Sequence, residues 1–340
     1  MKVLSSLPIH SFEQFRDAIY AFRIPRMILS ALELGLFSKM GDRTWSLSGL
    51  AKRVKASQRG VEILCRNLTS IGLLNYEDGR YRSSHMARRY LNMHSPEFRG
   101  AYLELLQRQW EDWSKLTSGI RIGKPVDEDK PETAEYRQSF TWAMHQRSVE
   151  TARQVTRQLP LTKARSFLDL GGGPGTYALH FLKRNSSLRA TIMDRPAALE
   201  VAKTLAKRYR LQSRMNFVPG DFLTESIPWR YDVVWYSNVL HIYSPKENLK
   251  VFRNVKRSLV PGGRIFIQDT FMQNPHGLGS VEANIFAVTM LLYTKTGNTY
   301  SVQDVKRWLQ RAGFSRTKTH RLRQGTGDWE GIILEGRIPD

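Results

Sequence analysis

Apolar residues near the N-terminus recur at the three-to-four-residue spacing of amphipathic helices. The first such group is Phe12, Phe15, Ile19 and Phe22. A second helix is expected over 28–37, with Gly35 as its stop, because glycine favours helix ends. Two further helices are expected after Ser46 or Ser48 and after Ser57, because serine is a favoured N-cap. The N-terminal part of the chain is therefore predicted to be built from short helices.

The helical spacing then gives way to a hairpin signal. The sequence Glu77-Asp78-Gly79 separates two short runs that favour strands, and Asp-Gly is typical of a hairpin turn. Helices followed by a hairpin are the outline of a winged helix. Residues 96–160 are expected to be largely helical again, with breaks at 123–125 and 127–131, where glycine and proline gather.

From Ser166 onward, short apolar runs alternate with helical segments. The expected strands are 166–170, 190–193, 216–218, 231–236 and 263–269. Strands that alternate with helices in this way predict a parallel sheet. The fold class is therefore α/β: a Rossmann-like, doubly wound, mostly parallel sheet, preceded by an all-helical domain of the winged-helix type. The boundary between the two is expected near 150–160.

A glycine-rich loop, 169–175, follows the first strand of the predicted sheet. Successive glycines between a strand and a helix let a ligand approach the backbone closely. Pro174 lacks an N–H and no Gly-Lys-Ser/Thr follows, so a phosphate-binding P-loop is excluded. Asp169 suits a ligand with an amino group. Asp194 suits the hydroxyls of a ribose, with a helix N-cap as the alternative. A nucleoside with a cationic amine and no phosphates describes S-adenosylmethionine.

With these residues the chain resembles a class I S-adenosylmethionine-dependent methyltransferase, and more narrowly the small-molecule O-methyltransferases of the caffeic acid and acetylserotonin type. The motifs that carry the resemblance span nearly the whole chain. They are Leu34-Gly35-Leu36-Phe37, the helix with Phe140, Met144 and Ser148, Gly220-Asp221-Phe222, Val239-Leu240-His241, Leu259 to Gly263, and Ala312-Gly313-Phe314. The resemblance implies a winged-helix dimerisation domain over 1–100, a helical region covering the cofactor cleft over 101–155, and a methyltransferase domain over 156–340.

The resemblance also implies a set of cofactor-binding residues. They are Phe140, Met144, Ser148, Asp169, Gly171, Gly173, Asp194, Asp221, Phe222 and Ser237. The methionine part of the cofactor would lie on the glycine-rich loop and the ribose on Asp194. The adenine would lie between Asp221 and Phe222. Ser237 stands where the family usually has a lysine.

His241 is expected to be a general base. A phenol has a pKa near 10 and is protonated at neutral pH, whereas a histidine with a pKa of about 6.5 suits proton removal. His241 follows a buried strand at its carboxyl end, where open α/β sheets place their sites. By the resemblance, Asp269 would hold the imidazole tautomer. The alternatives are a structural histidine and a strand-end acid at the surface.

A helix near residue 290 is expected to pack over the cleft and to line the acceptor pocket. Its candidate residues are Asn284, Phe286, Met290 and Tyr293, with core or dimer packing as the alternative. The chain departs from the family pattern here. Ile242-Tyr243 stands where Asp-Trp is usual, and Ser301-Val302-Gln303 stands near the second family glutamate. The acceptor is therefore expected to be a phenolic or polyketide-like hydroxyl, with transfer to carbon or nitrogen as the alternative.

Composition and charge bear on the partners of the chain. Lys and Arg total 52 against 31 Asp and Glu, a net charge of +21, which together with the winged-helix outline keeps a nucleic-acid-binding protein as an alternative. The positive excess is dispersed and the motif residues include several acids, so we expect a small-molecule acceptor and no nucleic acid. The resemblance implies a homodimer through the N-terminal domain.

No metal is expected, because the sequence shows no clustered His/Asp/Glu ligand set and a histidine base makes a metal unnecessary. The sequence holds one cysteine, Cys65, no signal peptide and no apolar run of membrane-spanning length. These features predict a cytoplasmic protein.

Overall fold

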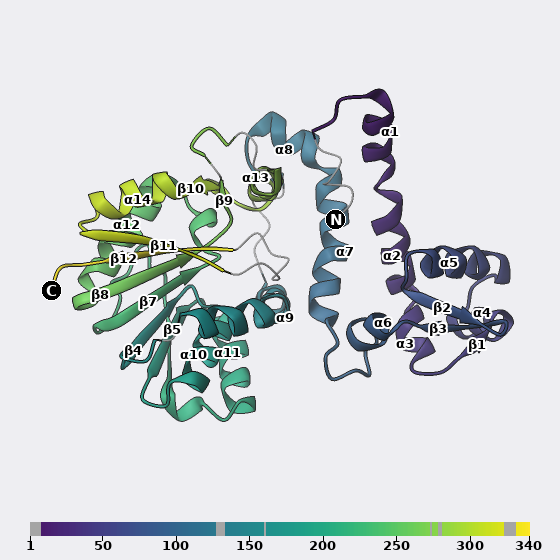
Figure 1. Ribbon diagram of the computed structural model, residues 1–340, viewed down its shortest axis with the longest axis horizontal. Coiled ribbons are helices and arrows are strands. Elements are labelled where there is room, and N and C mark those ends of the chain that lie inside the picture. The colour runs from purple at the N-terminus through teal and green to yellow at the C-terminus, as the bar shows by residue number, and fades with distance from the viewer. Residues whose placement is uncertain (1–7, 127–132, 160, 273, 278–280, 323–330) are drawn as a thin grey trace. The chain divides into compact units, whose positions relative to one another are not determined.

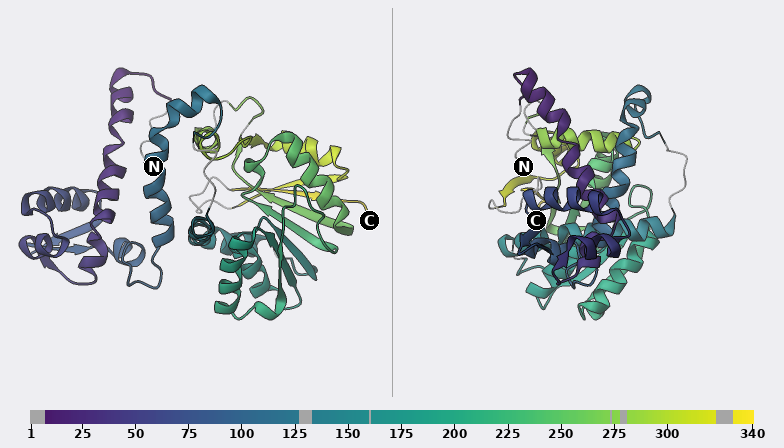
Figure 2. Two further views of the ribbon diagram at one scale, coloured as in Figure 1. Left: turned by 180° about the vertical axis from the view of Figure 1, so that it is seen from behind. Right: turned by 90° about the vertical axis from the view of Figure 1, so that its right-hand side faces the viewer.

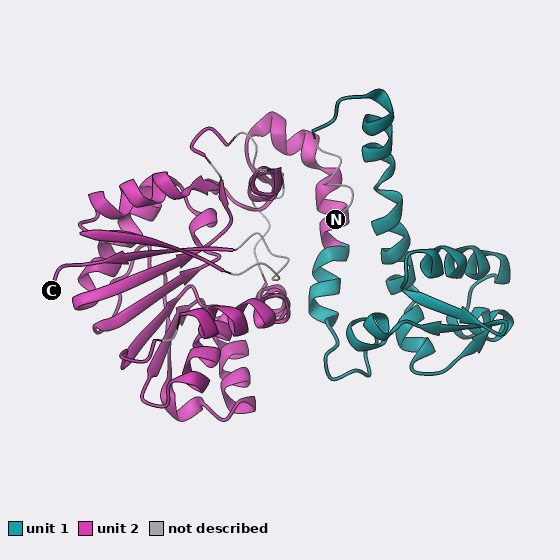
Figure 3. Ribbon diagram, viewed as in Figure 1, with its two compact units in different colours: residues 1–107 teal, residues 108–340 magenta. Residues whose placement is uncertain are grey.

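The computed structural model of the protein describes residues 8–126, 133–159, 161–272, 274–277, 281–322 and 331–340. The chain divides into two compact units, Met1–Gln107 and Arg108–Asp340 (Figure 3). The N-terminal unit is mainly helical, and the C-terminal unit is built around a large sheet.

The N-terminal unit has the predicted helices and hairpin, except that the segment expected as one helix over 28–37 belongs to two helices separated at Gly35. Its helices are α1 (Phe12–Tyr20), α2 (Arg23–Glu33), α3 (Leu36–Met40), α4 (Leu47–Val54), α5 (Gln58–Ser70), α6 (His85–Tyr90) and the first part of α7 (Gly100–Ser114). Ser46 and Ser57 cap α4 and α5 with their hydroxyls, and Gly35 follows the end of α2 with a φ of 64°. The strands β1 (Trp45–Ser46), β2 (Leu74–Glu77) and β3 (Arg80–Ser83) form a small antiparallel sheet that contains the hairpin.

The described residues of the C-terminal unit form a seven-stranded sheet in the order β11-β12-β8-β7-β4-β5-β6. The strands are β4 (Ser166–Leu170), β5 (Arg189–Asp194), β6 (Met215–Pro219), β7 (Tyr231–Ser237), β8 (Leu259–Gln268), β11 (Arg316–Arg321) and β12 (Ile332–Arg337). Strands β4 to β8 pair in parallel, whereas β12 runs antiparallel to both β8 and β11. The mostly parallel α/β sheet predicted from the alternating pattern is confirmed.

Helices cover both faces of this sheet. The further helices of this unit are α8 (Leu116–Ile122), α9 (Ala134–Gln158), α10 (Thr176–Arg184), α11 (Pro196–Arg208), α12 (Pro245–Arg257), α13 (Val281–Tyr293) and α14 (Val302–Arg311). Figure 1 shows α10 and α11 on one side and α12 and α14 on the other, and Figure 2 shows the same layers from behind. Each face has its own apolar core, one with α9, α10 and α11 and one with α12 and α14.

The parallel strands position the predicted site. Because β4 to β8 run in one direction, the segments that follow their carboxyl ends gather at one edge of the sheet. These segments are the glycine-rich loop, Asp194, Gly220-Asp221, the 237–242 segment and Asp269. Within the described part of the chain, no helix has the length and apolar character needed to cross a membrane.

Candidate active site

The glycine-rich loop between β4 and α10 uses glycines for both conformation and space. Gly171, Gly173 and Gly175 have positive φ values of 67°, 50° and 66°. A Cβ atom on Gly175 would overlap Ile192, and one on Gly171 would lie 2.7 Å from Cγ2 of Val239. L-residues with side chains rarely adopt this conformation, so glycine is required there. The loop therefore lies close against β5 and the segment after β7.

Asp194 ties this loop to the end of β5. Its carboxylate accepts hydrogen bonds from the backbone N–H of Gly173 at 2.7 Å and of Arg195 at 2.6 Å. Burial raises the pKa of Asp194, and these two hydrogen bonds oppose the rise. The N-cap of α11 is Arg195, so Asp194 itself is not the cap. A carboxylate oxygen accepts more than one hydrogen bond, so Asp194 can hold the loop and still accept from ribose hydroxyls.

Asp169 is a second carboxylate beside the loop, and it is fully buried. It is 2% exposed, and its Oδ2 accepts a long hydrogen bond of 3.4 Å from the backbone N–H of Ala178. Burial raises the pKa of Asp169 to about 7, the Ala178 hydrogen bond opposes the rise, and the nearby Asp194 adds to it. Among the described residues no cation forms an ion pair with Asp169. A cationic amine bound here would supply the missing opposite charge.

The helix α9 carries Phe140, Met144 and Ser148, whose spacing of four places them on one face of the helix. Ser148 is buried, and the other two are half-buried. The Nδ1 atom of His145 lies 2.9 Å from Oγ1 of Thr176, the first residue of α10. This hydrogen bond joins α9 to the helix that follows the glycine-rich loop. Sequence reasoning missed it, because no local pattern links positions 145 and 176.

The Gly-Asp-Phe element follows β6. Asp221 is exposed, and its side chain accepts a hydrogen bond from the backbone N–H of Leu223 at 2.9 Å. Phe222 is 7% exposed and packs edge-on against Tyr236 and Tyr243, with ring centroids 6.3 Å and 5.9 Å away. The contact of Phe222 with an adenine ring stays a prediction.

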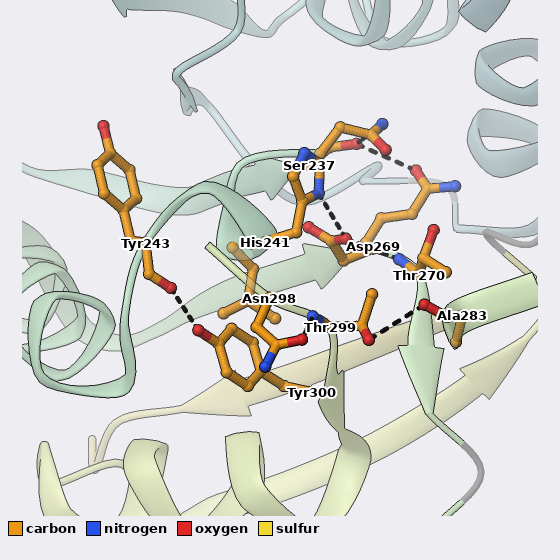
Figure 4. A network of polar contacts seen from close by, with 12 residues as sticks. Ser237, His241, Tyr243, Asp269, Thr270, Ala283, Asn298, Thr299 and Tyr300 are labelled. Carbon is orange, nitrogen blue, oxygen red and sulfur yellow. Dashed lines mark hydrogen bonds and ion pairs between the residues drawn. The ribbon is translucent and has the colours of Figure 1, made fainter. Parts of the chain in front are cut away.

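His241 and Asp269 lie together at the carboxyl ends of β7 and β8 (Figure 4). The Nδ1 atom of His241 is 2.8 Å from Oδ1 of Asp269, and this oxygen also accepts from the backbone N–H of Thr270 at 2.7 Å. His241 is 8% exposed and Asp269 1%. A carboxylate at Nδ1 favours the tautomer with the proton on Nδ1, which leaves Nε2 unprotonated and able to accept a proton. The pair therefore has the geometry of an oriented general base.

Two other segments hold the His241 residue in place. The ring of Phe286, on α13, meets the imidazole edge-on with ring centroids 4.7 Å apart. The backbone N–H of Asn298 donates to the carbonyl oxygen of His241 at 2.9 Å, and a Cβ atom on Gly297 would overlap that oxygen. The resemblance did not include Asn298 or Gly297.

One buried polar atom in this cluster is unsatisfied. The Oδ2 atom of Asp269 is buried and has no hydrogen-bond partner within the described residues. Buried polar atoms are usually paired, so this oxygen is a candidate acceptor for a donor that the chain itself does not supply. Ser237, at the end of β7, lies beside the pair in Figure 4 and accepts a hydrogen bond from the side chain of Asn238 at 3.2 Å.

The four residues predicted to line the acceptor pocket do not share one face of α13. At about 100° per residue, Phe286, Met290 and Tyr293 lie on one side and Asn284 lies opposite Phe286. Asn284 donates to the carbonyl oxygen of Gly277 at 2.7 Å. Met290 is buried, and the hydroxyl of Tyr293 donates to the carboxylate of Asp112 at 2.7 Å. The structure therefore brings Phe286 to His241 and points Asn284 elsewhere.

The segment near the expected second family glutamate begins a helix. Ser301 is the N-cap of α14, and it forms a capping box with Asp304, in which each side chain accepts from the other residue's backbone N–H. This is why serine occupies the position. Within the residues that the structure describes, no three His, Cys, Asp or Glu side chains gather in a way that could hold a metal ion.

Comparisons with known proteins agree with this geometry. A family model described as an O-methyltransferase domain matches residues 104–315, and an O-methyltransferase dimerisation domain matches residues 17–93. The chain is 27% identical over 302 residues to a 3-hydroxy-5-methyl-1-naphthoate 3-O-methyltransferase of Streptomyces sahachiroi, covering 87% of each chain. It is 28% identical over 310 residues to the tetracenomycin polyketide synthesis 8-O-methyl transferase of Streptomyces glaucescens, covering 88% of this chain and 90% of the relative.

A solved structure shares the whole fold. The human N-acetylserotonin methyltransferase in complex with S-adenosylmethionine superposes with a TM-score of 0.84 at 22% identity. The match covers 98% of this chain and 99% of the human chain.

Proposed function

The chain belongs to the O-methyltransferase family, and on this premise we propose that it methylates a hydroxyl of a phenolic or polyketide-like small molecule, with His241 as the general base. As a member of the family it is an S-adenosylmethionine-dependent enzyme. The observation that carries the proposed mechanism is the buried contact of 2.8 Å between His241 and Asp269 at the carboxyl edge of the sheet.

The residues around the glycine-rich loop fit the cofactor. S-adenosylmethionine supplies an electrophilic methyl group on a sulfonium. Asp169 is the main support for the fit, because it is a buried carboxylate beside the loop, without an ion pair to any described cation, and the cofactor carries an ammonium group. Asp194 would accept from the ribose hydroxyls, and Asp221 would accept from the adenine amine. Phe140 and Met144 on α9 would exclude water.

The chain's own residues would activate the acceptor. His241 takes the proton of the acceptor hydroxyl at Nε2, which raises the nucleophilicity of the oxygen. Asp269 holds the Nδ1 proton and stabilises the imidazolium that forms. Phe286 keeps the imidazole in an apolar environment.

The acceptor class rests on the relatives and on α13. Two relatives are named for O-methyl transfer to a hydroxynaphthoate and in tetracenomycin polyketide synthesis. An aromatic side chain beside the base, as Phe286 is here, suits a flat aromatic acceptor. The residues at 242–243 and 301–303 differ from those usual in the family. Methyl transfer to a carbon or nitrogen atom therefore stays the alternative to transfer to a hydroxyl.

We also propose a homodimer formed through the N-terminal unit and no nucleic-acid partner. The dimer proposal is supported by the dimerisation domain and by apolar side chains left on the surface of α1. Against a nucleic-acid reader, α5 uses Val61, Cys65 and Leu68 for core packing. The expected cytoplasmic location stays a prediction that cell fractionation would test.

The central experiment compares His241→Gln and His241→Ala with the parent enzyme. A screen of phenols, polyketides and indoles, read out as S-adenosylhomocysteine release, first identifies an acceptor. Both variants are then expected to lose about 10²–10⁴-fold in turnover, because general-base catalysis contributes about that much. Their affinity for S-adenosylhomocysteine, measured by calorimetry, is expected to be unchanged.

The control is His85→Gln, which changes an exposed histidine on α6. It is expected to retain the parent turnover. Turnover by His241→Ala close to the parent value would contradict the general-base role and would favour the carbon or nitrogen acceptor.

A further inference from the structure

The helices α9 and α10 form a hollow with a cationic rim. Its volume is about 340 Å³, and its lining residues are Arg153, Thr156, Arg157, His180, Lys183 and Arg184. Thr156 and His180 are buried, whereas the four cationic residues are exposed. The hollow thus combines a neutral, buried base with a positively charged edge.

The rim has few opposite charges. Arg153 pairs with Glu150 at 3.2 Å, in a pair whose two side chains are 52% and 56% exposed. In the part of the chain that the structure describes, no carboxylate pairs with Arg157, Lys183 or Arg184. The Lys183 ammonium lies 3.9 Å from the centroid of the Tyr209 ring. Like charges gathered at one hollow repel one another unless an anion neutralises them.

His180 contributes to the neutral base of the hollow. The side chain is 9% exposed, and its Nε2 atom is buried without a hydrogen-bond partner among the described residues. Burial, with smaller contributions from the nearby cations Lys183 and Arg153, lowers the pKa of His180 to about 4. The imidazole is therefore neutral at pH 7 and adds no positive charge to the four cations of the rim.

The hollow is separate from the predicted cofactor site. The helix α10 begins at Thr176, directly after the glycine-rich loop, and Lys183 lies in its last turn. Seven residues of α-helix span about 10 Å. The hollow therefore lies at the end of α10 that points away from the loop.

We propose that this hollow binds the phosphate group of a small anionic ligand, held by the rim cations above the neutral, buried base that Thr156 and His180 form. The size supports a small ligand, because 340 Å³ lies at the low end of the range for small-molecule sites. A nucleic acid would instead need an extended stripe of cations. This site is independent of the methyl-transfer reaction.

Cations also stabilise the carboxyl ends of helices, so the test needs a control for that effect. The test variant is the pair Lys183→Gln and Arg184→Gln. The matched control is Lys207→Gln and Arg208→Gln, an exposed Lys-Arg pair in the last turn of the neighbouring helix α11 that does not line the hollow.

Binding of inorganic phosphate and of pyrophosphate is measured by calorimetry at constant ionic strength. The parent and the control variant are expected to bind both anions. The test variant is expected to bind them about tenfold more weakly, because two charges next to the anion are lost. No binding by the parent, or equal binding by the test and control variants, would overturn the proposal.

A second measurement follows the imidazole itself. The groups that face His180 are Arg153 and Arg157 on α9 and Lys183 and Arg184 on its own helix. A bound phosphate would offset the charge of these cations. Its presence is therefore expected to raise the pKa of the His180 imidazole, measured by NMR titration of the parent. The test variant is expected to show a smaller shift at the same anion concentration.

A third experiment tests whether the hollow binds a small anion or a nucleic acid. A single-stranded oligonucleotide is titrated under the same conditions. Binding of the oligonucleotide without binding of phosphate or pyrophosphate would reject the small-ligand site in favour of a nucleic-acid surface.

Discussion

Burial sets the charge state of Asp169 in the folded protein. Its pKa rises from 3.8 to about 7 on burial, so between these pH values the folded chain holds a proton that the unfolded chain has released. The stability contributed by this group is therefore present below pH 3.8 and is lost as the pH rises toward 7. A buried carboxylate that costs stability at neutral pH is typical of a functional site.

The same shift predicts a pH dependence of cofactor binding. If the Asp169 carboxylate holds the ammonium group, a proton must leave it whenever the cofactor binds below pH 7. The affinity for S-adenosylhomocysteine, measured by calorimetry from pH 5.5 to pH 8, is therefore expected to fall toward acid by a factor that approaches about tenfold per pH unit, and to level off above pH 7. Asp169→Asn is expected to bind more weakly at pH 8 and to lose this slope.

The matched control is Glu200→Gln, which removes an exposed carboxylate on α11. It is expected to keep both the affinity and the slope. An unchanged slope in Asp169→Asn would contradict the assignment of Asp169 and would leave the half-buried Asp194 as the titrating group.

At the scale of single residues, the sequence indicated which polar side chains belong together but not how they are held. His241 and Asp269 were expected at the ends of neighbouring strands, and the structure places them 2.8 Å apart. The support from Phe286, Gly297 and Asn298 depends on how α13 and the turn after it pack, and no local pattern specifies that packing. For the same reason Asn284 was expected beside Phe286, although it lies on the other side of the helix.

At the scale of elements, the helices and strands were predicted well where a local signal exists. Serine caps, glycine stops and alternating apolar runs are decided by nearby residues. The predicted strand 263–269 is longer in the structure, because β8 begins at Leu259 and continues through Pro261-Gly262, a pair that reads as a turn. The two-residue strands β9 (Phe271–Met272) and β10 (Tyr300–Ser301) were not predicted, because they exist only through their pairing with each other.

The turn between α13 and β10 carries the next prediction. A Cβ atom on Gly297 would overlap the carbonyl oxygen of His241, so Gly297→Ala must move the backbone that carries the imidazole. The kcat is expected to fall by about tenfold, since a small misplacement of a catalytic group lowers the rate strongly. The KM for S-adenosylmethionine is expected to stay near the parent value, because the cofactor loop is not touched. Steady-state kinetics measures both constants.

Gly331→Ala is the matched control, because a Cβ atom on Gly331 would meet no atom of the described residues within 4 Å. It is expected to leave kcat unchanged. A parent-like kcat in Gly297→Ala would show that the turn does not position His241. Thermal unfolding of both variants separates a local displacement from a general loss of stability.

At the scale of the whole molecule, the net charge of +21 loses its value as a pointer to nucleic acid. The residues of the predicted cofactor site include Asp169, Asp194 and Asp221, which suit a cationic cofactor rather than a polyanion. Among the described residues, one place where cations do gather around a concave surface is the hollow between α9 and α10. Part of the positive charge is therefore explained by the anion site proposed at this hollow, which the binding experiments test. The rest of the charge acts on solubility and association.

The last prediction concerns assembly. Phe12, Phe15 and Ile19 on α1 are 73%, 49% and 56% exposed, which leaves a large apolar helix face in contact with water in the single chain. If this face forms the dimer, the pair Phe12→Ser and Phe15→Ser removes apolar contacts from both subunits at once. Four phenylalanines leave the interface of the dimer, and at about 2 kcal/mol for each one that is fully buried the dimer dissociation constant is expected to rise by up to about 10⁶-fold. Light scattering after size-exclusion chromatography over a range of concentrations measures this change.

The control, Ile63→Ser with Ile71→Ser, alters two residues at α5 that are 42% and 39% exposed, and it is expected to remain dimeric. A dimer that resists the α1 substitutions but dissociates with those at α5 would move the interface to α5.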